Sequence, residues 1–277
     1  MNRRLPLLAA VLAAMLALTA AALAATSTIT QTAKSGSVTA TFTYKITTSK
    51  DFPTYSGERL TITRNETMAY NAPVYTKDCS PDCTPGDPRA KGHSAQIADL
   101  SGSGEPNVIL TLFTGGAHCC QIAQVFTYSS STMTYAKTEH NFEDPGFSLK
   151  KLSGAYRFES ADWRFEYEFT SFAQSGVPIQ IWEFTGSAFS DVTKSYPSLI
   201  RKDAAEWWKV FKANIHNGPG GVLAAWAADE ELLGNDALVQ KTLQTQLKAG
   251  HLTGGFVNGN AYVKLLNKDL VKFGYKK

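Results

Sequence analysis

The chain has 277 residues, 43% of them hydrophobic and 18% charged, and its formal net charge at pH 7 is +3. This length is sufficient for one large domain or two smaller ones. A nucleic-acid-binding protein needs a clustered basic surface, whereas the lysines here are scattered until the last part of the chain. The composition therefore argues against a nucleic-acid partner.

The first 25 residues have the pattern of a secretory signal peptide. Arg3 and Arg4 form the positive start, Leu5 to Leu23 is rich in alanine and leucine, and Ala22-Leu23-Ala24 has the small-x-small pattern that signal peptidase recognises. The apolar stretch is about long enough to span a bilayer, but it is mostly alanine and a polar segment follows it directly. We therefore expect cleavage, a secreted protein of the cell envelope or extracellular space, and no membrane span after cleavage. Removal of the two arginines lowers the net charge from +3 to +1.

Alternating apolar and polar side chains predict strands early in the chain. Residues 36–46 alternate cleanly, and Leu60, Ile62 and Met68 continue the pattern after a turn, which indicates an antiparallel hairpin. Two further strands, rich in valine, isoleucine, leucine and phenylalanine, are expected at Asn107–Phe113 and Gln121–Tyr128.

The clearest alternation lies in residues 163–170, where Trp163, Phe165, Tyr167 and Phe169 would share one face of a strand. We expect this strand to pair with a second one at residues 177–184. The aromatic face could serve as a sugar-stacking platform, but a face covered by another layer of the fold is the interpretation we favour.

Helical spacing replaces alternation near Ser198. The expected helices are Leu199–Ile215, Val222–Leu233, Ala237–Leu247 and Ala261–Phe273. Strands followed by helices predict an α+β fold, with an antiparallel β-rich region (26–197, propeller-blade-like or sandwich-like) and a helical subdomain (198–277).

The four cysteines are Cys79, Cys83, Cys119 and Cys120, and an even number in an exported chain favours disulfides. Links between the first pair and the second would join two distant segments. The alternative is two local bridges, of which a bridge between neighbours distorts the intervening peptide. We favour the cross-links over the local bridges. A soft-metal site formed by Cys79, Cys83, His118 and Cys119 is a further alternative.

The segment Asp99-Leu100-Ser101-Gly102-Ser103-Gly104 has the spacing of a DxDxDG calcium loop. The candidate metal ligands are Asp99, Ser101, Ser103 and Glu105. Because two serines replace carboxylates and calcium affinity depends on ligand charge, we favour a tight turn held by hydrogen bonds between these side chains and backbone amides. We accordingly expect no cofactor, with calcium as the candidate to be tested.

The longer segment IADLSGSGEPNVILTLFTGGAHCC (residues 97–120) resembles the D-L-D-G-D-G-x-P-E-V units of FG-GAP/VCBS-type repeat proteins. It is also similar to a group of exported bacterial proteins of unassigned function that carry a GGAHCC strand end. A looser second copy lies in residues 175–197. The resemblance implies a propeller-like or stacked-blade sheet in an incomplete form, because too few units are visible for a closed propeller.

No catalytic residue is assigned from the sequence. His118 would need a nucleophile and an orienting acid nearby, and the chain has neither a G-x-S-x-G elbow nor an HExxH motif. Asp229-Glu230-Glu231 lies on an expected helix, where adjacent carboxylates point in different directions, so we interpret it as a solvated helix face.

The sequence favours an exported binding or structural module, with a glycan, a peptide or a protein as its ligand, over an enzyme. The alternative is an extracellular hydrolase that acts on cell-wall or another polymer. A groove with Asp or Glu side chains opposed across it would favour the hydrolase.

Overall fold

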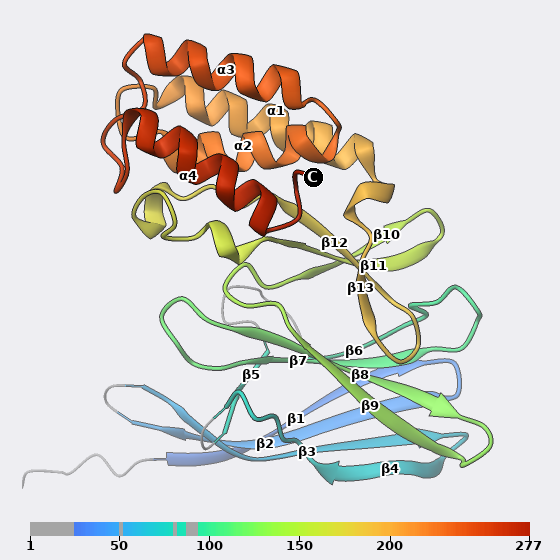
Figure 1. Ribbon diagram of the computed structural model, residues 1–277. Helices are drawn as coiled ribbons and strands as arrows, with labels where there is room; N and C mark the ends of the chain where they lie inside the picture. The colour runs from blue at the N-terminus through green and yellow to red at the C-terminus, as the bar shows by residue number, and fades with distance from the viewer. Residues whose placement is uncertain (1–24, 50–51, 80–81, 87–93) are drawn as a thin grey trace, which may run out of the picture.

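The structure, a computed structural model, describes residues 25–49, 52–79, 82–86 and 94–277. The expected signal peptide therefore lies outside the described residues, apart from Ala25. Three antiparallel sheets are stacked one on another, and the helices gather at one end of the stack (Figure 1). This arrangement confirms the expected α+β class.

The first sheet has four strands in chain order, β1 (Ala25–Ser35), β2 (Val38–Thr48), β3 (Thr54–Arg64) and β4 (Thr67–Pro73). The second sheet has the order β5-β7-β8-β9, with β6 also paired to β7, and its strands are β5 (Thr84–Pro85), β6 (Ala95–Ala98), β7 (Asn107–Phe113), β8 (Gln121–Ser129) and β9 (Thr134–Asn141). The third sheet contains β10 (Ser148–Leu152), β11 (Ala155–Ala161), β12 (Ile179–Phe184) and β13 (Phe189–Asp191) in chain order.

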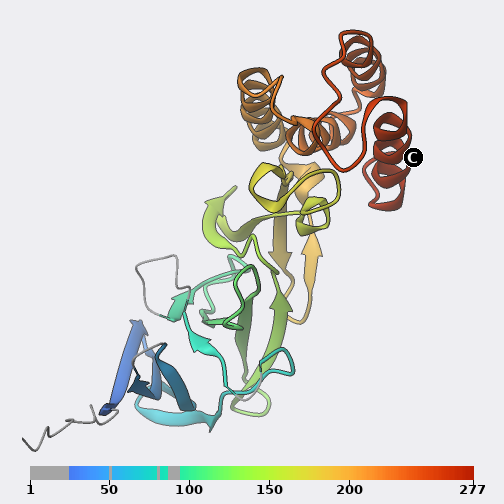
Figure 2. The same ribbon diagram turned by 90° about the vertical axis from the view of Figure 1, so that its left-hand side faces the viewer.

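The described chain has four α-helices, all close to their expected positions: α1 (Pro197–Ala213), α2 (Gly220–Leu232), α3 (Asp236–Lys248) and α4 (Gly259–Lys272). Short 3-10 helices precede them: η1 (Trp163–Phe165), η2 (Phe172–Gln174) and η3 (Thr193–Ser195). Figure 2 shows the helices at the end of the molecule opposite β1–β4, with the third sheet between them.

The second sheet is buried on both faces, which explains the continuous apolar sequence of β7. Val108 and Leu110 pack with the core of the first sheet, whereas Ile109 packs with Phe158 and Phe184 of the third sheet. Successive side chains of a strand point to opposite faces, so a strand in the middle of three layers must be apolar at nearly every position.

The first sheet is buried on one face only. On β2, Phe42 is fully buried while its neighbours Thr41 and Thr43 lie on the opposite, more exposed face. This is the alternation that the sequence predicts for residues 36–46. Met68 departs from the prediction, because its side chain is 60% exposed.

Helix α2 is the centre of the helical core and is buried around nearly its whole circumference. Its first turn passes so close to the preceding segment that a Cβ on Gly221 would lie 2.5 Å from the backbone oxygen of Gln174. Only glycine permits this approach. The close contact joins the helices to the end of the β-rich region.

Residues 163–170 do not form the predicted strand. Phe165 and Phe169 are fully buried in the helical core, whereas Trp163 and Tyr167 are about half exposed. The segment is a series of turns that begins with η1, and Tyr167 has a positive φ of 57°. The expected partner strand exists as β12, but it pairs with β11 and β13. The alternation of aromatic residues in this segment therefore reflects burial of Phe165 and Phe169 against the helices and does not indicate pairing in a sheet.

Candidate functional site

A surface groove follows the junction between the third sheet and the helices. It consists of three adjoining cavities of about 280, 330 and 440 Å³. The first two share Arg164, Gln180 and Asp191, and the last two share Lys194 and Tyr275, so they form one continuous depression. We call it the junction groove. Junctions between structural units are frequent sites of ligand binding, and volumes of this size are typical of ligand pockets.

The end of the groove nearest the second sheet is aromatic. Trp163 is 48% exposed there, and Trp182 donates from Nε1 to Oε1 of Gln180 at 3.2 Å. The ring of His140 packs against Trp182 and Phe189, with centroids 4.5 and 4.9 Å apart. Burial lowers the pKa of His140, so this histidine is neutral at neutral pH.

Arg164 lies at the middle of the groove and is fixed by Asp162. Its Nε donates to Asp162 Oδ1 at 2.8 Å and its Nη2 to Oδ2 at 2.5 Å, while Tyr275 Oη donates to the same Oδ2 at 2.9 Å. Nη2 also donates to the carbonyl of Phe273 at 3.3 Å. The hydrogen bonds to Asp162 raise the pKa of Arg164, which is therefore charged at every physiological pH. Among the described residues these hydrogen bonds use Nε and Nη2, which leaves the Nη1 hydrogens for a ligand.

Asp191 lies at the end of β13 and lines two of the three cavities. Its Oδ1 accepts hydrogen bonds from the backbone amide of Thr193 at 2.8 Å and from the Thr193 hydroxyl at 2.5 Å. These bonds form the turn into η3 and fix the carboxylate in place. Gln180 and Asp191 thus present amide and carboxylate groups beside the Arg164 guanidinium.

A pair of carboxyl groups is buried where α1 meets α2. Asp229 is fully buried, and burial, followed by the charge of Asp203, raises its pKa to about 10. Asp203 Oδ2 accepts from the Ile179 amide at 2.9 Å and from Trp207 Nε1 at 3.0 Å. Asp229 is therefore protonated at neutral pH and lies near the Asp203 carboxylate, whose charge contributes to the rise. The interpretation of residues 229–231 as a solvated face is wrong, because Glu231 is also buried.

The predicted calcium loop is a closed turn in the structure. The Asp99 carboxylate accepts hydrogen bonds from the backbone amides of Gly102, Ser103 and Gly104 at 2.8, 3.2 and 2.7 Å. Partial burial opposes ionisation, but these hydrogen bonds outweigh it and lower the pKa of Asp99. They are the bonds that the turn interpretation predicts.

The other candidate calcium ligands have partners of their own. The Ser101 hydroxyl donates to that of Ser103 at 2.8 Å. Glu105 forms a two-point ion pair with Arg64 of β3, at 2.6 and 2.9 Å. This ion pair ties the turn to the first sheet. Whether the loop binds calcium stays a prediction.

The cysteines form two local bridges, Cys79–Cys83 and Cys119–Cys120, so the favoured cross-links between the two segments are wrong. With all four thiols bridged, the soft-metal alternative has no thiolate ligands in this state. Glu143 Oε2 lies 2.9 Å from the sulfur of Cys120. His118 packs against Phe172 with the rings tilted by 42° and their centroids 4.0 Å apart, and it lies outside the residues that line the junction groove.

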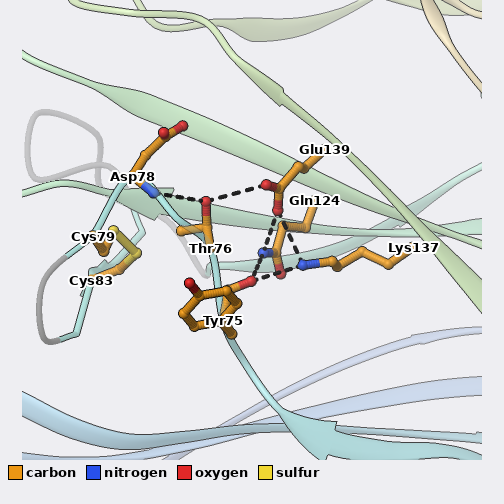
Figure 3. A network of polar contacts seen from close by, with 8 residues as sticks. All are labelled: Tyr75, Thr76, Asp78, Cys79, Cys83, Gln124, Lys137 and Glu139. Atoms are coloured by element: carbon orange, nitrogen blue, oxygen red, sulfur yellow. Dashed lines mark hydrogen bonds and ion pairs between the residues drawn. A yellow bond between two sulfur atoms is a disulfide. The ribbon is translucent and has the colours of Figure 1, made fainter.

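The segment that leads into the Cys79–Cys83 bridge is held on the second sheet by a polar network (Figure 3). Gln124 of β8 and Lys137 of β9 both donate to the backbone oxygen of Tyr75 at 2.8 Å. Thr76 donates to Oε1 of Glu139 at 3.3 Å. These contacts hold residues 75 and 76, which lie outside regular secondary structure, against β8 and β9.

Sequence reasoning missed the residues of the junction groove. The strand expected at residues 163–170 would place Arg164 on the face opposite the aromatic rings, and Trp182, Gln180 and Asp191 belong to no motif. The neighbouring Asp162 and Arg164 are a weak signal, since aspartate often caps a turn by accepting from an amide two residues later, as Asp162 does here at 3.1 Å.

Comparison with known proteins gives partial matches. A probable thylakoid lumen protein of Synechocystis sp. is 30% identical over 161 residues, which are 55% of this chain and 47% of that protein. An uncharacterized protein of Sinorhizobium fredii is 25% identical over 137 residues, which are 47% of this chain and 21% of that protein. The chain thus spans about half of the first relative and a fifth of the second.

No family model matches the chain, and no solved structure matches it significantly. The resemblance of residues 97–120 to FG-GAP/VCBS units therefore stays a prediction. Within the described residues, no helix is both long enough and apolar enough to cross a membrane.

Proposed function

We propose that the protein is an exported binding protein whose junction groove holds a saccharide. The observation that carries this proposal is the aromatic end of the groove, where two tryptophans lie beside an amide, a carboxylate and a guanidinium group. Indole rings offer flat apolar surface, and the polar groups can exchange hydrogen bonds with hydroxyl groups. A saccharide has both apolar faces and hydroxyl edges.

The charges near the aromatic end favour a neutral or weakly charged saccharide. The charge of Arg164 is largely offset by Asp162, which is 1% exposed. His140 is neutral, and Asp191 lies close enough to Arg164 to interact with its charge. The aromatic end of the groove therefore has no strong electrostatic field of one sign that would favour a highly charged ligand.

Binding is better supported than hydrolysis. A hydrolase needs a carboxyl group that is free to transfer a proton and a second that is free to act as base or nucleophile. Asp162 is bound by Arg164 and Tyr275, and Asp191 is bound by Thr193. Asp229 is fully buried and protonated, Asp203 accepts from Ile179 and Trp207, and neither lines the cavities described above.

Export is supported by the signal-peptide pattern of the first 25 residues and by the name of the Synechocystis protein, which places that relative in the thylakoid lumen. Both observations concern compartments reached by transport across a membrane. Which of these compartments holds this protein is a matter for fractionation of the native host.

The proposal is tested by titrating the purified protein with soluble oligosaccharides, including peptidoglycan fragments, and following tryptophan fluorescence and heat of binding. We expect saturable binding that Trp163→Ala weakens at least tenfold. Phe256→Ala is the matched control, because Phe256 is also an exposed aromatic residue, at 62%, but does not line the groove.

Absence of binding to every saccharide, or equal binding by wild type and Trp163→Ala, would contradict the proposal. New reducing ends released during incubation would instead support the hydrolase.

A further inference from the structure

A second site lies away from the junction groove, at the edge where β3 meets the Cys79–Cys83 loop. It is a cavity of about 20 Å³ lined by Glu58, Val74, Tyr75, Thr76, Cys79, Asp82 and Cys83. This volume is enough for one water molecule or one ion. Two of the lining residues are acidic.

Glu58 points into the protein because of an irregularity in β3. The pairing of β2 with β3 shifts register between Thr43 and Lys45, and Gly57 takes a positive φ of 67° at this point. Such bulges redirect side chains. Glu58 consequently shares the buried face with Leu60 and Ile62.

The Glu58 carboxylate is buried, and its hydrogen bonds do not fully offset the free-energy cost of that burial. The residue is 5% exposed, and its Oε1 has no hydrogen-bond partner among the described residues. A buried carboxylate oxygen without a donor costs free energy, so such an oxygen indicates a missing ligand or proton. Within the described ranges, no lysine or arginine pairs with Glu58.

Asp82 brings a second carboxylate to the same cavity. It directly precedes Cys83 of the Cys79–Cys83 bridge, and the segment that leads into this bridge is held by the network around Tyr75 and Thr76 (Figure 3). Burial, together with the charge and hydrogen bonding of Asp82, raises the pKa of Glu58 to about 7 even though its own backbone amide opposes the rise. Two carboxyl groups held this close need a shared proton or a cation between them.

We propose that Glu58 and Asp82 bind one calcium ion in this cavity. The two carboxylates supply two negative charges, which match a divalent cation, and the Thr76 hydroxyl adds a neutral oxygen to the cavity wall. The sulfurs of Cys79 and Cys83 are bridged and offer no thiolate, so the donors are the oxygens that hard cations prefer. Calcium tolerates irregular geometry better than magnesium does, and most residues that line this cavity lie outside regular secondary structure.

This site is separate from the DxDxDG-like turn. In that turn the Asp99 oxygens are occupied by backbone amides, and Glu105 is occupied by Arg64. At the Glu58 site a buried oxygen is left without a donor. The cavity beside the first disulfide is therefore a better candidate calcium site than the turn at residues 99–104.

The experiment uses terbium, a luminescent substitute for calcium, followed by calorimetric titration with calcium at about pH 8, where the Glu58 carboxyl is ionised. Tyr75 lines the cavity and can sensitise terbium emission. We expect one equivalent of terbium to bind and calcium to displace it.

Glu58→Gln and Asp82→Asn should each lower the affinity at least tenfold. Asp82 is exposed, so its variant tests the site without disturbing the core. Asp78→Asn is the matched control, because Asp78 directly precedes the Cys79–Cys83 bridge and carries the same charge but accepts from Asn141 at 3.3 Å and does not line the cavity.

Absence of terbium and calcium binding by the wild type would overturn the proposal, and the carboxyl pair would then share a proton. Equal affinity in the Asp78→Asn and Asp82→Asn variants would assign the binding to general surface charge. If only Asp99→Asn abolished binding, the calcium site would be the turn at residues 99–104. Each of these results contradicts the proposal without bearing on saccharide binding in the junction groove.

Discussion

Tyr275, near the end of the chain, donates a hydrogen bond of 2.9 Å to the carboxylate of Asp162, which is 1% exposed and precedes the first 3-10 helix. Arg164 binds the same carboxylate from the groove side. One buried carboxylate therefore connects the last residues of the chain, the end of the third sheet and the lining of the junction groove.

Tyr275→Phe should destabilise the protein by about 2 kcal/mol, because it removes one hydrogen bond to a buried charged acceptor and leaves the ring in place. Urea denaturation measures the change. Tyr75→Phe is the control, since that side chain is 69% exposed, and it should change the free energy of unfolding by less than about 0.5 kcal/mol. Equal effects of the two substitutions would show that the Tyr275–Asp162 contact contributes nothing.

Asp229 should make stability fall as pH rises. Its pKa is about 10 in the folded protein and near 3.8 when unfolded, so between these values the folded state retains a proton that the unfolded state loses. The contribution is complete below about pH 3.8 and is lost by about pH 10, with a slope of up to about 1.4 kcal/mol per pH unit.

Asp229→Asn should flatten this slope, because the amide is always neutral and can still donate to Asp203. The measurement is urea denaturation at several values from about pH 5 to about pH 8. Glu230→Gln, one residue further on the same helix and less buried, should keep the slope of the wild type. A wild-type slope that survives Asp229→Asn would mean that other groups cause it.

Asp99→Ala should cost about 1–2 kcal/mol, since three backbone amides lose their acceptor. If the turn is held by these bonds alone, the loss is the same with calcium and with a chelator. A loss that appears only in the presence of calcium would show that Asp99 is a metal ligand after all.

The disulfide pairing can be read from a non-reduced tryptic digest. Cys79 and Cys83 fall in the peptide 78–89, and Cys119 and Cys120 fall in the peptide 92–137. Local bridges should therefore give two separate peptides, each lighter than its reduced form by two hydrogens. A single linked species that contains both peptides would support the cross-links instead.

Much of the secondary structure follows from local patterns. The strands at 107–113 and 121–129 and the four helices lie close to where periodicity places them, because an apolar face has to be buried whatever covers it. The edge strand β1 and the strands β9–β11 were missed, because their side chains are mostly half-buried or exposed and carry little pattern.

The candidate sites could not be predicted in the same way. Arg164 meets Asp191 and Tyr275 only after the third sheet and the helices have packed, and Glu58 meets Asp82 only because a bulge and a disulfide loop face each other. Each pair is separated by many residues, and no spacing rule connects its members.

Residues 163–170 show which properties local periodicity predicts and which depend on tertiary contacts. The alternation of large aromatic rings is enough to predict burial of Phe165 and Phe169, although Trp163 and Tyr167 of the same pattern are about half exposed. That the covering layer is helical, that the segment turns instead of pairing, and that Asp229 is neutral all depend on how the helices pack on the rest of the fold. Local periodicity records which side chains avoid water, whereas partners, charge states and cavities depend on contacts between segments far apart in the chain.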